Sequence, residues 1–206
     1  MAITAKDVRR VHITDDEVDE VHARSAFLAR TIQDRKNLHD RSYQERLTDI
    51  EMGEFGELAC LKYFHDHGKY AVSAVDKTSG RPDAGFDLIL RCADGGKFFR
   101  CSVKTSLSVF KSDPEDIIAT FQLGSTPKEL SQVNIQVYFY YNIHPKKGET
   151  RVTVLTVDNL IIVGWIGLLQ ALKMMGEGHY TGEDRPTVDI PLRNLNPMDE
   201  LLEYLS

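Results

Sequence analysis

The pattern of apolar and polar positions divides the chain into a helical first third and a later part with strand periodicity. Over residues 14–68 apolar residues recur at spacings of three and four and proline is absent, which predicts helices. Thr14 opens a capping-box pattern, since Glu17 follows it by three positions. The polar run 33–43 predicts a break, with a second helix over about residues 47–67.

After residue 68 the pattern changes to that of β-strands. Short β-prone segments predict strands at residues 70–75, 86–90, 98–105, 133–143 and 151–157. The Asp94-Gly95-Gly96 sequence predicts a hairpin turn before the third of them. Capping residues before Pro114 and Pro127 predict short helices. The remaining expectations are an extended segment or a helix start near residues 158–165, a helix at 168–175, a strand in the tail and a helix at 198–205.

This order of elements predicts the α/β class in its mixed α+β form. We expect a mixed, mostly antiparallel sheet of four to six strands with helices on its faces. Residues 1–46 would form an N-terminal helical arm and residues 47–206 a single globular unit, because no repeat, low-complexity tract or long linker divides the chain.

Composition narrows the class of protein. Of 206 residues, 42% are hydrophobic and 27% charged, the balance of a globular protein rather than a disordered one. The formal net charge is -6, so bulk charge gives no argument for a nucleic-acid partner, and binding DNA would require a local basic surface. Three dispersed cysteines predict reduced thiols. Because residues 1–10 lack an apolar core and the longest apolar stretch is ten residues, we expect a cytoplasmic protein that is not in the membrane.

One set of polar residues indicates chemistry. Glu54 and Glu57 lie on the second predicted helix, Asp87 opens a strand, and Lys104 lies on the strand after the glycine hairpin. Because residues two apart on a strand share a face, Ser102 and Lys104 should point to the same side. An aspartate, a lysine and a helical glutamate could therefore converge. Carboxylate oxygens and a backbone carbonyl are ligands that suit Mg²⁺.

The order of these motifs resembles the PD-(D/E)XK nuclease superfamily, which has a restriction-endonuclease-like αβββαβ core. The residues that match are a Gly-x-x-x-Glu pattern at 53–57, the strand aspartate Asp87, and 102–104 at the acid-x-lysine motif. The resemblance covers about residues 53–157. It implies that Asp87 is a metal ligand, that Val103 offers its carbonyl, that Glu57 holds the metal or its water, and that Lys104 activates water and stabilises the phosphate.

The sequence departs from this family at Ser102, where the family has Glu, Asp or Gln. One anionic ligand is therefore missing, and Ser102 would take its place as a weaker neutral donor. Asp83, after Pro82, and Glu54 are alternative sources of a second carboxylate.

The resemblance implies a metal-dependent endonuclease that hydrolyses DNA phosphodiester bonds with Mg²⁺, Mn²⁺ substituting, in restriction or in phage or repair DNA processing. It also implies a homodimer, with the N-terminal helices as an interface. No nucleoside triphosphate site is expected, because Gly95-Gly96 lacks the spacing of a phosphate loop. Two alternatives stay open: a catalytically inactive nuclease-fold module that binds DNA or protein, and a structural protein in which Asp87, Lys104 and Glu57 form a buried ion-pair network.

Overall fold

The computed structural model describes residues 2–31, 42–77, 85–108, 110–142, 157, 159–176, 180–181 and 187–206, and the structural statements below concern these residues. After the short strand β1 (Arg9–Val11) come two long helices, α1 (Asp15–Thr31) and α2 (Tyr43–Asp66). The predicted capping box at the start of α1 is confirmed, because the Thr14 N–H donates to Glu17 Oε2 at 2.8 Å. A second capping box starts α2 earlier than expected, at Ser42.

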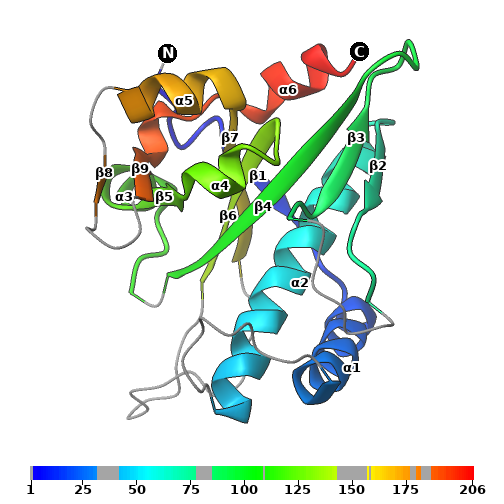
Figure 1. Cartoon of the computed structure of the whole chain (residues 1–206). Coiled ribbons are helices and arrows are strands. Elements are labelled where there is room, and N and C mark those ends of the chain that lie inside the picture. Colours follow the sequence, from blue (N-terminus) through cyan, green and yellow to red (C-terminus); the bar gives the residue numbers. More distant parts are fainter. Residues whose placement is uncertain are drawn as a thin grey trace.

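Six strands form the main sheet, in the order β1-β7-β6-β4-β3-β2 (Figure 1). Their bounds, besides β1, are β2 (Tyr70–Ser73), β3 (Leu88–Arg91), β4 (Phe98–Ser108), β6 (Ile135–Asn142) and β7 (Asn159–Gly167). β4 and β6 are parallel, and the other neighbours are antiparallel. The predicted mixed, mostly antiparallel sheet flanked by helices is therefore confirmed.

The parallel pair requires a crossover, and the chain builds it from short elements. α3 (Pro114–Thr120), β5 (Gln122–Ser125) and α4 (Pro127–Leu130) connect β4 to β6. Both predicted proline-started helices are present, with Asp113 and Thr126 as their caps. A second sheet that the sequence did not predict joins β5 to β9 (Thr187–Pro191) and β8 (Tyr180–Thr181). The strand expected at 151–157 and the alternative helix start at 158 lie outside the described residues, apart from residue 157.

Each face of the main sheet has its own core. On one face α2 and α6 (Met198–Tyr204) bury residues such as Phe55, Leu88 and Phe139. On the other face the small sheet, with α3, α4 and α5 (Leu168–Gly176), buries side chains of β6 and β7. In Figure 1 the small sheet and α3 lie at one side of the molecule, and β2 and β3 lie at the opposite side. Among the described residues, the second core therefore packs on the β6–β7 half of the main sheet.

Helix α2 approaches β4 closely at one glycine. A Cβ on Gly56 would lie 2.2 Å from Oγ1 of Thr105 and 3.3 Å from a methyl group of Val103. Only glycine leaves room for the strand here, so the helix lies directly against the segment of β4 that contains the candidate motif. In the part of the chain that the structure describes, none of the helices combines the length and the apolar character needed to cross a bilayer.

Candidate functional site

Asp87 lies at the point where the pairing of β3 with β4 ends. Its N–H donates to the carbonyl of Cys101 at 2.9 Å, and its own carbonyl accepts the N–H of Ala74 at 2.8 Å. The carboxylate turns to the edge of β4, where Oδ2 accepts the N–H of Val103 at 2.7 Å and the hydroxyl of Ser102 at 3.3 Å. The structure thus brings the candidate aspartate to the candidate 102–104 motif.

This contact also locates the Val103 carbonyl. The N–H and C=O of one strand residue point to the same side of the strand. Since the Val103 N–H points at Asp87, its carbonyl faces the same edge of β4, past the last β3 pair, Leu88 with Cys101. A carboxylate oxygen, a hydroxyl and a backbone carbonyl therefore share one edge of the sheet.

The helix glutamates form an ion cluster on the α2 side. Glu54 and Glu57 are 6% and 5% exposed, which makes both carboxylates buried. The ammonium of Lys77 lies between them, 2.9 Å from Glu54 Oε2 and 3.0 Å from Glu57 Oε2. Glu54 is also paired with Arg24. Glu57 Oε1 is buried and has no hydrogen-bond partner among the described residues. Glu57 therefore retains a free ligand atom, whereas Glu54 is paired with two cations.

The buried thiol of Cys60 is affected by both Asp87 and Glu57. Burial raises its pKa, and the negative charges of Asp87 and Glu57 raise it further. Cys60 lies on α2 with Glu57 and belongs to the core between α2 and the sheet. The same pKa shift keeps the thiol protonated at neutral pH, so Cys60 is not a nucleophile.

Lys104 has a different partner from the one expected. Its ammonium lies 3.0 Å from Oε1 of Glu129, a residue of the first turn of α4. Burial alone would raise the pKa of Glu129, but the N–H of Thr126 and the positive charge of Lys104 outweigh it and lower the pKa. Lys104 is thus held, with Ser102, on the face of β4 that α4 covers, whereas α2 and Glu57 lie against the opposite face, to which Val103 and Thr105 point. Of the expected convergence, the structure brings Asp87 to the 102–104 motif but does not bring Lys104 to Glu57.

Two residues of this arrangement were missed by sequence reasoning. Lys77 lies just after β2 and has no motif around it, so nothing in the sequence signals its role. Glu129 does have a signal, because the Thr126 to Glu129 spacing is a capping box, which is confirmed by the 2.9 Å bond from the Thr126 N–H. That pattern indicates a helix start, however, and not a partner for Lys104.

No family model, curated protein or solved structure matches this chain. The chemistry of the site must therefore be inferred from its own contacts.

The donor atoms suit a hard divalent cation. Asp87 and Glu57 offer carboxylate oxygens, Ser102 a hydroxyl and Val103 a carbonyl, and Mg²⁺ prefers such oxygen ligands while it keeps several waters. The unpartnered, buried Oε1 of Glu57 is a carboxylate oxygen that fits such a cation. Within the described ranges no three His, Cys, Asp or Glu side chains converge on one point, so two carboxylates are the most that this set provides. Asp83 lies outside the described residues.

Proposed function

We propose that this protein is a Mg²⁺-dependent nuclease that hydrolyses DNA phosphodiester bonds. The observation that supports this most is the position of Asp87, whose carboxylate accepts hydrogen bonds from Val103 and Ser102 at the edge of β4. An ordinary surface aspartate would not need to be fixed against the backbone of a neighbouring strand.

The order of elements supports the same proposal. A helix, three strands that pair in sequence, short helices and a parallel strand follow one another as α2, β2, β3, β4, α3 with α4, and β6. Apart from β5, which lies between α3 and α4 and pairs in the second sheet, this order resembles the αβββαβ order of the core that the motifs imply. The candidate residues lie at its first helix, second strand and third strand.

In the proposed reaction, Asp87 and Glu57 would hold Mg²⁺, and the Val103 carbonyl would be a neutral ligand. Bound Mg²⁺ supplies a water of lowered pKa and neutralises charge on the scissile phosphate. The hydroxyl of Ser102 orients Asp87 through its hydrogen bond. Lys104 stabilises the charge that develops on the phosphate oxygens, for which its ammonium must be shared with Glu129 or released from it.

A second candidate function is that of a nuclease-fold module that binds DNA or protein without cutting. The observation that favours it is that both lysines already have anionic partners, Lys77 with Glu57 and Lys104 with Glu129. With Ser102 in place of an acid, such a site is close to a neutral network that needs no metal.

The decisive experiment is a cleavage assay. Supercoiled, linear and single-stranded DNA are incubated with the full chain and Mg²⁺, Mn²⁺ or a chelator, and binding of each metal is measured by calorimetry. We expect metal-dependent cleavage that Asp87→Asn lowers by at least about 100-fold. Asp94→Asn, at the exposed hairpin turn, is the matched control and should cleave normally.

The helix glutamates provide a second arm of the same assay. Glu57→Gln should impair cleavage more than Glu54→Gln, because Glu57 has the unpartnered oxygen and Glu54 is paired with Arg24 and Lys77. Metal binding without cleavage would favour the binding module. Absence of both metal binding and cleavage in a folded protein would refute the nuclease proposal.

A further inference from the structure

The half of the main sheet that the second core leaves uncovered has an unusual surface. Over β2, β3 and the segment of β4 that pairs with β3, six side chains point away from α2. We refer to these positions as the open face: Tyr70, Val72, Ile89, Arg91, Phe98 and Arg100. They form two rows across three strands. One row is Tyr70, Arg91 and Phe98, and the other is Val72, Ile89 and Arg100. Two arginines and two aromatic rings thus lie among aliphatic side chains, with no acidic residue at any of the six positions.

These rings are exposed rather than packed. Phe98 is 59% exposed and Tyr70 is 49% exposed. The guanidinium of Arg91 lies over the Phe98 ring at 5.2 Å from its centroid, and Arg100 lies over the ring of Phe86 at the same distance. Each guanidinium thus lies beside an aromatic ring on this face, and that of Arg91 also donates to the carbonyl of Gly95 at 3.3 Å. A protein of net charge -6 concentrates cations here beside aromatic rings.

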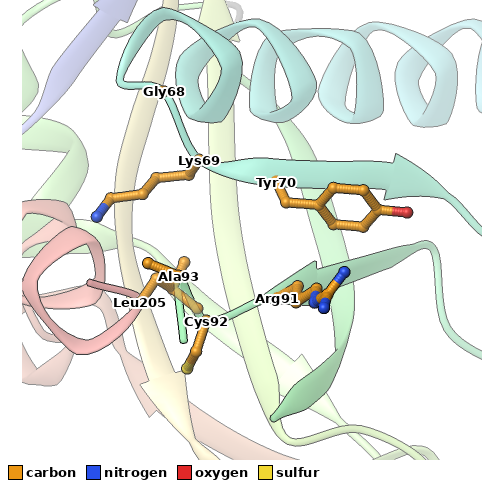
Figure 2. A pocket seen from close by; sticks show the side chains of 7 residues that line it. All are labelled: Gly68, Lys69, Tyr70, Arg91, Cys92, Ala93 and Leu205. Atoms are coloured by element: carbon orange, nitrogen blue, oxygen red, sulfur yellow. The ribbon is translucent and has the colours of Figure 1, made fainter. Parts of the chain in front are cut away.

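The open face continues at both of its ends. At one end Tyr70 and Arg91 also line a pocket of about 320 Å³ with Lys69, Cys92 and Leu205. Figure 2 shows the side chains of Tyr70 and Arg91 extending to the same side, and that of Lys69 extending away from them. At the other end the Phe86 and Arg100 pair adjoins Asp87, the next residue in the chain. The face therefore leads from the pocket to the proposed catalytic site.

We infer that the open face binds single-stranded DNA. Exposed rings stack on bases of any sequence, and neighbouring arginines contact the phosphates, which is how proteins hold single strands. A duplex hides the faces of its bases and would gain little from Phe98 or Tyr70. The inference rests on the proposed function for its substrate, DNA, and specifies the form of that substrate: an unpaired strand that lies along β3 and reaches Asp87.

The test measures binding without cleavage. The affinity of the full chain for a fluorescein-labelled single strand of about 12 nucleotides is measured by anisotropy, in chelator and at several salt concentrations. Phe98→Ala should weaken binding by about 5- to 100-fold, because one stacked base is lost. Arg91→Gln should weaken binding and reduce the slope of log affinity against log salt by about 0.7.

Matched controls come from other surfaces. Phe27, on α1, is 51% exposed, and Arg193 is exposed beyond β9. Phe27→Ala and Arg193→Gln should leave single-strand affinity within about twofold of the unchanged protein. Phe98→Ala should also leave affinity for the corresponding duplex unchanged. Thermal melts of each variant establish that it is folded.

Failure of this inference differs from failure of the proposed function. If the chain does not bind single strands, or if Phe27→Ala weakens binding as much as Phe98→Ala, the open face is not the binding surface, whatever the cleavage assay gives. If Phe98→Ala weakens binding and Phe27→Ala does not, the open face is supported as the binding surface. If Asp87→Asn also leaves cleavage unchanged, the proposed nuclease site is refuted.

Discussion

The two ends of the main sheet are built differently. At the β6–β7 end both faces are covered, and the strands contain nearly continuous apolar runs, with Tyr140, Ile161 and Ile162 all buried. At the β2–β3 end only the α2 face is covered, and residues alternate, so that Ala71 is buried while Tyr70 and Val72 are exposed. A strand covered on both faces must be apolar throughout, whereas a strand covered on one face leaves alternate positions free.

This difference bears on the position of the candidate site. Asp87, Ser102 and Lys104 lie on β4 or beside it, at the border between the covered and the uncovered end. There the neighbouring core fixes the backbone, α4 lies over Lys104, and Asp87 is only partly buried and within reach of a ligand. Three comparisons between variants test this contrast, and they follow in order of their expected effect on stability.

The largest effect is expected at the covered end. Phe139 on β6 is fully buried, so Phe139→Ala should lower the free energy of unfolding by about 3 to 5 kcal/mol through lost burial and a cavity. Phe98→Ala on the open face removes the same ring from a largely solvated position and should cost less than about 1 kcal/mol. Urea denaturation of both variants checks this, and equal losses would show that the open face is packed against something.

A smaller effect is expected from the ion clusters on the two faces of β4. Lys77→Met would leave Glu54 paired with Arg24 and the buried carboxylate of Glu57 without a described cation, at a cost of about 1 to 3 kcal/mol. Lys104→Met, the control, breaks a pair in which Glu129 is half-exposed, and should cost less than about 1 kcal/mol. The same urea titrations measure both. If Lys104→Met were the more costly change, the assignment of the buried cluster to the α2 face would be wrong.

The smallest effect depends on pH. The pKa of Glu129 is below its ordinary value of 4.5 in the folded protein, so the ionised carboxylate favours folding above that value and the contribution is lost as the pH falls through the lowered pKa. From pH 6 to pH 3, the free energy of unfolding should therefore fall less in Glu129→Gln than in the unchanged protein. The two falls should differ by at most about 1 kcal/mol. Unfolding free energies at the two pH values test this, and an equal loss in both proteins would contradict it.

Much of this architecture could be predicted from periodicity. The long helices, the hairpin after β3 and the strand β7 follow from local pattern, since residues 159–167 are apolar and β-prone. The small sheet was missed because β8 has only two residues and β5 contains a single apolar residue, Leu123, so neither shows a strand pattern. β1 was missed for the same reason, since its three residues are recognisable only by their pairing with β7.

The candidate site was predictable only in part. Spacing across one hairpin was enough to expect that Asp87 would meet the 102–104 motif. The partners of the cations were not predictable, because Lys77 and Glu54 are brought together by the packing of α2 on the sheet, and Lys104 and Glu129 by the crossover between β4 and β6. Such contacts join residues from different elements, and no local pattern encodes them.

The pairing of β1 with β7 has a consequence for how the chain folds. Arg9 pairs with Ile162, Ile3 donates its N–H to the carbonyl of Arg193, and Arg9 forms an ion pair with Asp199. During synthesis residues 3–11 leave the ribosome long before residues 160–199, with which they pair, so this edge of the sheet stays open until those residues are made. Contacts this distant in sequence make folding slow and the late intermediates prone to pairing with other chains, so β1 should be among the last strands to dock.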